Sequence, residues 1–290
     1  CWLRVRLSLI DQFGGGVKLH ECGQFHRVNI NEYRLPLGHC GYVLYEGPSV
    51  LDGAPIVMIM TMDTANRKTG NMIQTWIIRS DVSPLDASRT KTDSSICGNC
   101  PHKWSAGGAC YVNIGQAPTS IYKAYKRGAY TNLTHTHNAN LDTAMLHDLL
   151  ENRFIRLGAY GDPAAVPVHL LQTLTTYASG HTGYTHQMRH KNFDPAVLNY
   201  CMASADTLKQ ATNLWANAAR TFRIAKDITE STLQPGEIEC LADAKGIPCS
   251  ACRLCDGKKG ENVLGNFPNI VIAVHGARSG RFLNNKTTRA

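Results

Sequence analysis

The chain has no hydrophobic stretch long enough to cross a membrane. Its longest apolar run covers residues 55–62, whereas a transmembrane helix needs about 20 apolar residues. It also lacks a signal-peptide pattern, and it begins at Cys1 rather than at methionine. Charged residues make up only 18% of the chain and no long run of lysine or arginine occurs, so the net charge of +8 permits contact with nucleic acid without requiring it. We expect a cytoplasmic protein with no membrane partner, acting on a small-molecule substrate or a redox partner.

A disulfide framework is also missing. The 290 residues contain eleven cysteines, an odd number, and several of them lie in C-x2-C pairs or triplets instead of being scattered along the chain. In a chain of this size, such spacing is typical of metal ligation in a reducing compartment.

The densest cysteine group lies in the sixteen residues from Cys240 to Cys255. Cys249, Cys252 and Cys255 have C-x2-C-x2-C spacing, the core spacing of ferredoxin-type cluster ligation. In ferredoxins the fourth cysteine lies downstream, where this chain has Lys259, so Cys240 is the expected fourth ligand. All-thiolate sites favour zinc or an iron–sulfur cluster. Because three thiolates on one short loop suit a cube better than a single tetrahedral ion, we expect a 4Fe-4S cluster, with zinc as the alternative.

A second cysteine group precedes it in the chain. Cys97 and Cys100 form a C-x2-C-P-H motif, and Cys110 follows ten residues after Cys100. The best fourth ligand is Cys201, which lies at an expected strand end. Two separate clusters, one cluster shared by both groups, and structural zinc all remain open at this point.

Short apolar runs alternate with helical patterns along most of the chain, which favours parallel strands joined by crossover helices. Counting about eight such units, we expect a single (β/α)8 TIM-barrel-like domain over residues 55–278, with a doubly wound α/β sheet as the alternative. An irregular segment, residues 1–54, precedes this domain, and a polar tail, residues 279–290, follows it. The expected strands are marked by Gln74, Cys110, Phe154, Tyr184, Cys201, Phe222, Glu239 and Ile270.

Three residues are candidates for catalysis because they follow expected strands, and the carboxyl ends of barrel strands carry the active site. His186 and His275 are the candidate general acid or base. Asp162 either orients a histidine or caps the helix that Pro163 begins. Asp206, together with the nearby Ser204, is expected to cap a helix.

Five segments together resemble a family of bacteriophage proteins of poorly defined function. The resemblance extends over about residues 75 to 276, and it implies a phage-encoded, cysteine-rich protein that binds an iron–sulfur cluster in the infected cell. It supplies no settled reaction, and hydrolysis of simple esters is a secondary hypothesis. The segments are residues 97–102, 156–163, 183–187, 201–204 and 249–257.

Three functions follow as hypotheses. The first is a cluster-bearing enzyme, with hydrolysis favoured over redox chemistry, in which an open iron polarises a carbonyl or activates water. Radical S-adenosylmethionine chemistry is disfavoured because its C-x3-C-x2-C motif is missing. The second is an electron-transfer protein. The third is a zinc-stabilised nucleic-acid-binding protein, although aromatic residues are not interleaved with the basic ones as single-strand binding favours.

Overall fold

The computed structural model describes residues 18–21, 24–27, 41–133, 142–259 and 268–284, and it divides the chain into two units at Cys40 and Gly41. In the first unit, β1 (Lys18–Glu21) pairs with β2 (Gln24–Arg27) in an antiparallel ribbon. The compact second unit begins at Gly41, earlier than the expected boundary at residue 55. Cys22 and Cys40, two cysteines of the expected irregular segment, lie outside the described residues.

A six-stranded mixed sheet forms the first half of the compact unit, in the order β6-β3-β4-β5-β7-β8. β3, β4 and β5 form antiparallel pairs, whereas the β5–β7, β7–β8 and β3–β6 pairs are parallel. The hairpin turn between β3 and β4 depends on Gly53, whose φ of 79° is in the left-handed region that favours glycine. The strands are β3 (Gly41–Pro48), β4 (Pro55–Thr61), β5 (Ile73–Arg79), β6 (Thr131–Asn132), β7 (Phe154–Tyr160) and β8 (Gly180–Thr182).

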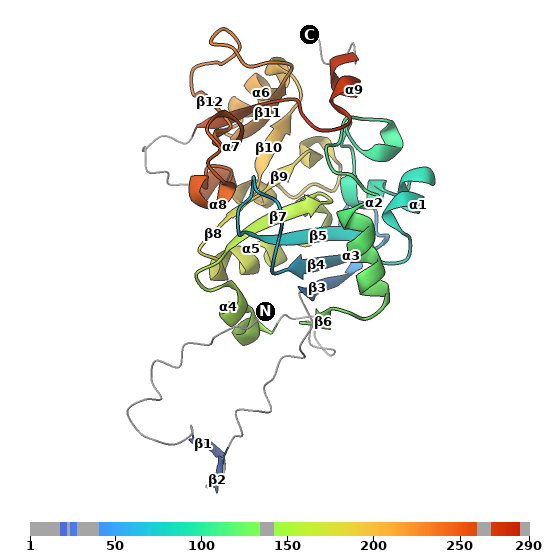
Figure 1. Cartoon of the computed structure of the whole chain (residues 1–290), viewed down its shortest axis with the longest axis vertical. Helices are drawn as coiled ribbons and strands as arrows, with labels where there is room; N and C mark the ends of the chain where they lie inside the picture. The colour runs from blue at the N-terminus through green and yellow to red at the C-terminus, as the bar shows by residue number, and fades with distance from the viewer. Residues whose placement is uncertain (1–17, 22–23, 28–40, 134–141, 260–267, 285–290) are drawn as a thin grey trace. The chain divides into compact units, whose positions relative to one another are not determined.

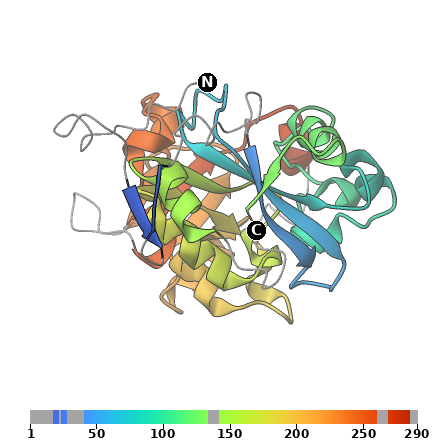
Figure 2. The same cartoon turned by 90° about the horizontal axis from the view of Figure 1, so that it is seen from below.

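The main hydrophobic core surrounds the central strand β4. Its residues from Ile56 to Thr61 are all buried, which explains why they form a continuous apolar run rather than an alternating pattern. α3 (Ala117–Lys126) lies on one face of this sheet and α5 (Val168–Tyr177) on the other, as Figures 1 and 2 show. From α5, Leu170, Leu171 and Leu174 are buried in this core.

A five-stranded parallel sheet forms the second half, in the order β12-β13-β11-β10-β9. The chain passes from the first sheet to the second at Gly183, which separates β8 from β9. A buried ion pair supports β12, because Arg223 on β11 donates from Nε (2.7 Å) and Nη2 (2.6 Å) to the carboxylate of Glu237. The strands are β9 (Tyr184–Thr185), β10 (Met202–Ala205), β11 (Thr221–Ala225), β12 (Glu237–Glu239) and β13 (Asn269–Ala273).

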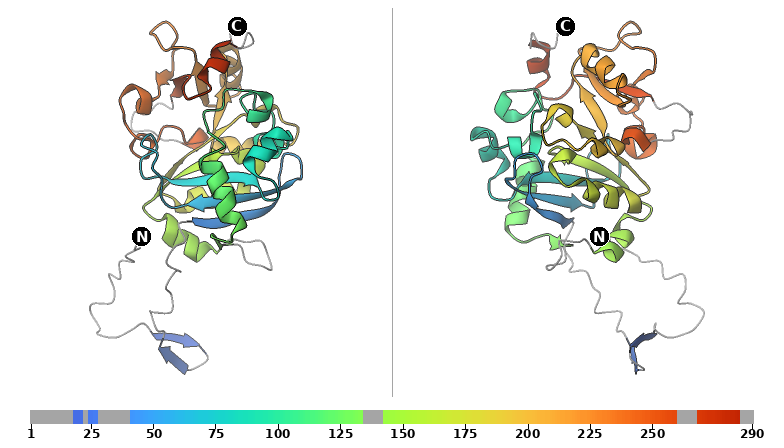
Figure 3. Two further views of the ribbon diagram at one scale, coloured as in Figure 1. Left: turned by 45° about the vertical axis from the view of Figure 1, so that its right-hand side comes forward. Right: turned by 180° about the vertical axis from the view of Figure 1, so that it is seen from behind.

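The remaining helices connect the strands and cover the sheets (Figure 3). Thr207, rather than Ser204 or Asp206, caps the helix after β10 by accepting a hydrogen bond from the backbone N–H of Gln210. The expected polar tail begins with a helix whose Phe282 is buried. The α-helices are α1 (Pro84–Arg89), α2 (Ser94–Cys97), α4 (Thr143–Leu150), α6 (Leu208–Trp215), α7 (Leu241–Ala244), α8 (Cys249–Cys252) and α9 (Ser279–Asn284). The 3-10 helices are Trp104–Ala106, Pro163–Ala165, Gln187–Arg189, Pro195–Asn199 and Gly257–Lys259.

The expected closed barrel does not form in the described part of the chain. Its strands belong to separate sheets, and β3, β4 and β5 are joined by turns that make them antiparallel, whereas a (β/α)8 barrel needs eight parallel strands. The strand expected after Cys110 is also missing, since Trp104 donates its indole N–H to the carbonyl of Val112 (2.8 Å) in an irregular loop. The architecture is a mixed α/β fold with open sheets, consistent with the doubly wound alternative.

None of the helices in the described residues is both long and apolar enough to span a membrane.

Candidate metal and catalytic centres

The carboxyl edge of the five-stranded sheet brings together residues that are far apart in the sequence. His186 follows β9, Asp206 follows β10, Cys240 follows β12 and His275 lies shortly after β13. Because all five strands are parallel, these residues lie along one edge, which is where open α/β sheets bind their ligands. The expectation that functional side chains follow strand ends therefore holds for the edge, although the fold is not a barrel.

His102, His186 and Asp206 form a compact group at this edge. The Nε2 atom of His102 lies 2.7 Å from Oδ1 of Asp206, and Nε2 of His186 lies 3.4 Å from the same oxygen. The ligand atoms of the three residues all lie within 4.8 Å of one another. The three side chains are only 12%, 20% and 9% exposed, respectively. A largely buried group of two imidazoles and one carboxylate suits either proton transfer or the binding of a divalent metal ion.

The electrostatics of this group favour positive charge. Burial opposes ionisation of Asp206, but hydrogen bonds from the two histidines hold its pKa well below its usual value. Burial likewise opposes the charged form of His186, yet Cys100 and Asp206 raise its pKa well above its ordinary value. Asp206 is therefore an ionised carboxylate with two imidazoles directed at it.

Asp162 is not part of this group, but its hydrogen bonds hold the segment that carries His186. Its Oδ2 atom accepts 2.9 Å hydrogen bonds from the backbone N–H of His186 and from the side-chain amide of Gln187. Its Oδ1 atom accepts from the backbone N–H of Ala164 (3.0 Å), which confirms the capping role. Gln187 also donates to the carbonyl of Cys97 (2.8 Å), so the pair ties the first cysteine loop to His186.

The first cysteine loop lies against His186. Cys97, Cys100 and Cys110 are close enough that charge on Cys100 or Cys110 raises the pKa of Cys97, in addition to the larger effect of burial. Burial also raises the pKa of Cys110 to about 11, and Cys100 is one of the groups that raise the pKa of His186. The structure thus brings these three thiols together near the carboxyl edge of the five-stranded sheet.

Cys201 lies elsewhere, 1% exposed in the main hydrophobic core. Burial and the charge of Asp162 raise its pKa, and none of the other cysteines contributes to that shift. A β-carbon on Gly183 would lie 2.7 Å from its sulfur, so the thiol fills the space where the chain changes sheets. Its surroundings are those of a packed core cysteine. The first cysteine loop therefore lies next to His186 and not next to Cys201, the fourth ligand expected from the sequence.

A small pocket brings Cys240, Cys249, Cys252 and Cys255 together, with Tyr184 among its other walls. Charge on each of the other three cysteines raises the pKa of Cys255, whose burial raises it further. Backbone contacts fix the three segments that supply the thiols. The N–H of Cys240 donates to Val271 (2.8 Å), that of Cys249 donates to Lys68 (2.8 Å), and that of Gly183 donates to the carbonyl of Cys255 (3.0 Å).

Arg156 lies beside this cysteine pocket without a carboxylate partner among the described residues. Its Nη2 atom donates to the hydroxyl of Tyr111, and its buried Nε atom has no hydrogen-bond partner. Burial lowers the pKa of Arg156, but Tyr111, Tyr184, Cys249 and Cys255 more than offset this effect. Since Tyr111 follows Cys110 directly, Arg156 links the surroundings of the two cysteine groups.

His275 does not meet His186. Its ring stacks on Tyr111, with ring centroids 5.8 Å apart, and its Nδ1 atom lies 3.1 Å from the carbonyl oxygen of Ala273. At the carboxyl edge of the five-stranded sheet, the expected set of Asp162, His186 and His275 is therefore replaced by His102, His186 and Asp206. Neither His102 nor Asp206 was assigned to a site from the sequence. The signals that could have found them are the C-x2-C-P-H motif, which ends at His102, and the position of Asp206 directly after a strand.

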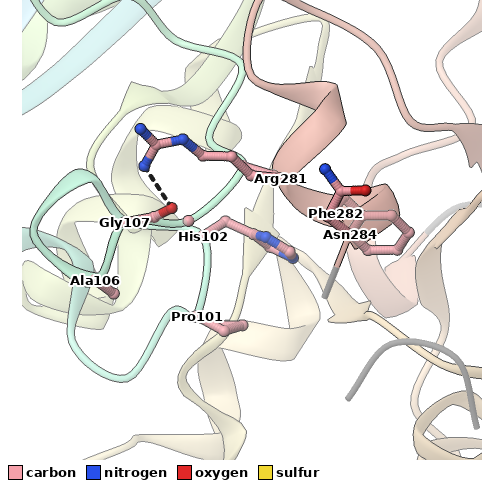
Figure 4. Close-up of a pocket in the computed structure, with 9 residues that line it drawn as sticks. Pro101, His102, Ala106, Gly107, Arg281, Phe282 and Asn284 are labelled. Atoms are coloured by element: carbon pink, nitrogen blue, oxygen red, sulfur yellow. Dashed lines mark hydrogen bonds between the residues drawn. The ribbon is translucent and has the colours of Figure 1, made fainter. Parts of the chain in front are cut away.

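A cavity of about 400 Å³ opens beside His102. Figure 4 shows the His102 ring pointing from the loop toward Phe282 and Asn284 of α9, with Arg281 hydrogen-bonded to Gly107 at the opposite side. The Arg281 Nη1 to Gly107 carbonyl distance is 2.7 Å. This cavity gives a small molecule a route to the histidine.

Comparisons of the chain with protein-family models, with curated proteins and with solved structures found no match.

Proposed function

We propose that the protein is an iron–sulfur enzyme that hydrolyses ester-type substrates. In this proposal Cys240, Cys249, Cys252 and Cys255 hold a 4Fe-4S cluster, and the reaction takes place beside His102 at the carboxyl edge of the parallel sheet. The observation that carries the cluster is the half-buried guanidinium of Arg156, whose buried Nε atom has no hydrogen-bond partner and which lies next to these thiols.

A half-buried cation that has an unpartnered buried nitrogen and no counter-charge is destabilising. Metal-bound cysteines are deprotonated, so a centre with four thiolates supplies negative charge at the position where Arg156 lacks it. Four neutral thiols would leave this guanidinium uncompensated. The donor set and its surroundings therefore fit an anionic metal–thiolate centre.

The spacing of the thiols favours a cluster over a single zinc ion. With Zn–S bonds of about 2.3 Å, sulfurs around tetrahedral zinc lie about 3.8 Å apart. Within the described residues, no three cysteine sulfurs lie within 4.8 Å of one another. A cube separates its ligands more widely than one ion does. The same consideration applies to Cys97, Cys100 and Cys110, which remain the candidate location for a second cluster.

Hydrolysis is the reaction that the group of His102, His186 and Asp206 supports best. An ester bond is broken by adding water, and the reaction consumes no oxidant or reductant. An imidazole and carboxylate group activates water either as a general base or by holding a metal ion. The 400 Å³ cavity at His102 offers room for a small ester.

The cluster is tested by purifying the full chain without oxygen and recording its visible absorption together with its iron, sulfide and zinc content. We expect a coloured protein with about four iron and four sulfide per cluster. Replacing Cys252 by alanine is expected to remove the absorption of the cluster held by its pocket, whereas Cys201→Ala is expected to keep it. A colourless protein that contains only zinc contradicts the proposal.

The hydrolytic reaction is tested with small chromogenic esters. We expect His186→Ala to lose turnover while it keeps the visible absorption of the iron–sulfur cluster, and His147→Ala, on the exposed surface of α4, to retain both. Unchanged turnover in His186→Ala would show that the group of His102, His186 and Asp206 does not take part in the reaction.

A further inference from the structure

We propose that Nε2 of His102, Nε2 of His186 and Oδ1 of Asp206 hold one divalent transition-metal ion, zinc or ferrous iron, separate from the iron–sulfur cluster. Of the three ligands, His102 lines the cavity. The choice of water activation as its role rests on the proposed hydrolytic function, whereas binding of the ion does not.

Two of the separations between the three atoms are close to those of metal ligands. Metal–nitrogen and metal–oxygen bonds of about 2.0–2.1 Å place neighbouring ligands about 2.9–3.4 Å apart in octahedral or tetrahedral geometry. The two measured separations from Oδ1 of Asp206 are 2.7 Å, to His102, and 3.4 Å, to His186. An ion can therefore enter with only small movements of the side chains.

Hydrogen bonding alone explains this arrangement less well. An N–H···O hydrogen bond usually has a length of 2.7–3.2 Å, so the 3.4 Å contact of His186 is long for one, although it is normal for two ligands of one ion. Both imidazoles also direct Nε2 at the same oxygen. Two histidines and one carboxylate are the ligands of catalytic zinc sites and of non-haem iron sites that keep open positions.

The scaffold holds each ligand in place. Asp162 fixes the backbone of His186 through the 2.9 Å hydrogen bond at its N–H, and Gln210 accepts a 2.8 Å hydrogen bond from the N–H of Asp206. The ring of His102 packs against Phe282, with centroids 5.7 Å apart. Because the supports come from separate elements, the three ligand atoms are positioned before any ion arrives, as a functional metal site requires.

The loop that carries His102 is built for close approach. A β-carbon on Gly108 would lie 2.4 Å from the Cα atom of His102 and 2.3 Å from the carbonyl oxygen of Pro101, so only glycine fits there. Gly108 and His102 both line the cavity, so one of the three ligands borders this open space.

The test is cobalt(II) titration of the metal-depleted full chain, followed by its absorption spectrum. A histidine and carboxylate site gives weak visible bands, whereas thiolate ligands add an intense near-ultraviolet charge-transfer band. We expect one cobalt equivalent with only weak visible bands, in addition to any cobalt that the four-cysteine pocket binds with the thiolate band, and we expect Asp206→Asn and His102→Gln each to weaken binding of the first equivalent at least 100-fold. Cys252→Ser and Cys100→Ser are expected to retain it.

His147→Gln is the matched control, because His147 and Asp148 form a surface pair, 3.5 Å apart, with side chains 52% and 75% exposed. Unchanged cobalt binding in Asp206→Asn overturns the inference, as does a cobalt spectrum that is entirely thiolate-like and disappears in Cys100→Ser. If Asp206→Asn fails to fold, the spectrum of the unmodified chain still decides the ligand type. Iron and sulfide that persist in a folded Asp206→Asn separate failure at this site from failure of the cluster.

Discussion

The carboxylate of Asp162 accepts a 2.9 Å hydrogen bond from the backbone N–H of His186, twenty-four residues further along the chain. The same oxygen accepts the amide of Gln187, and the other oxygen caps a 3-10 helix at Ala164. Asp162 is thus a positioning residue that fixes the chain after β9. It holds His186 through the backbone N–H and not through the imidazole.

Replacing Asp162 by alanine leaves three donors without their acceptor, two of them backbone N–H groups. We expect the free energy of unfolding to fall by about 3 kcal/mol, because unsatisfied buried groups cost more than the lost bonds alone. Urea denaturation measures this. Asp194→Ala is the matched control, because Asp194 caps a 3-10 helix at an exposed site through a 2.9 Å bond to Ala196 and should lose only about 1 kcal/mol. Equal losses in the two variants contradict the positioning role.

The Arg223–Glu237 pair predicts a large effect in the parallel sheet. The two side chains are 7% and 0% exposed, so Glu237→Gln leaves a buried guanidinium without its counter-charge. We expect a loss of about 3–5 kcal/mol in the free energy of unfolding. The exposed Arg89–Asp86 pair provides the comparison, and Asp86→Asn should change stability little. A stability of Glu237→Gln close to that of the unmodified chain shows that the pair does not support β12.

Gly108→Ala tests the link between the cysteine loop and His102. The added methyl group collides with backbone atoms of Pro101 and His102, and we expect a destabilisation of about 1–3 kcal/mol together with weaker cobalt binding. In Gly115→Ala the new methyl group meets nothing closer than 3.4 Å, so this variant should keep its cobalt affinity. Equal cobalt affinity in the two variants means that the loop does not position His102.

Arg156→Met tests the counter-charge of the four-cysteine centre. A nearby cation stabilises the reduced cluster, which carries one more negative charge, so its removal should lower the reduction potential. Spectroelectrochemical titration of the reconstituted chain measures the shift. Arg253→Met is the control, because Arg253 lies at the exposed end of the same pocket and stacks on Phe154, 4.1 Å from the ring centroid. A potential that rises or stays constant in Arg156→Met contradicts the account.

Local elements could be predicted from the sequence, but their assembly could not. The strand expected at residues 221–225 matches β11, and the one expected at residues 74–79 is β5 with one more residue, because apolar alternation and flanking turns are local signals. Strand pairing is non-local, and nothing in the sequence near Gly183 indicates that the chain changes sheets there. The prediction of a barrel was therefore wrong, although most of the predicted strands are present.

The candidate site follows the same division. Close spacing was enough to group Cys249, Cys252 and Cys255, whose thiols line one pocket. By contrast, the contact between His102 and Asp206 joins residues 104 positions apart and depends on how two loops meet at the sheet edge. The prediction for Cys201 used its place at a strand end, which does not reveal that its side chain points into the core.

The most direct test of the central claim is iron K-edge X-ray absorption of the full chain purified without oxygen. The account predicts that iron has sulfur neighbours and a second shell of iron, since a cluster at Cys240, Cys249, Cys252 and Cys255 places iron atoms next to each other. Iron surrounded only by nitrogen and oxygen, or with sulfur neighbours but no iron shell, would contradict it.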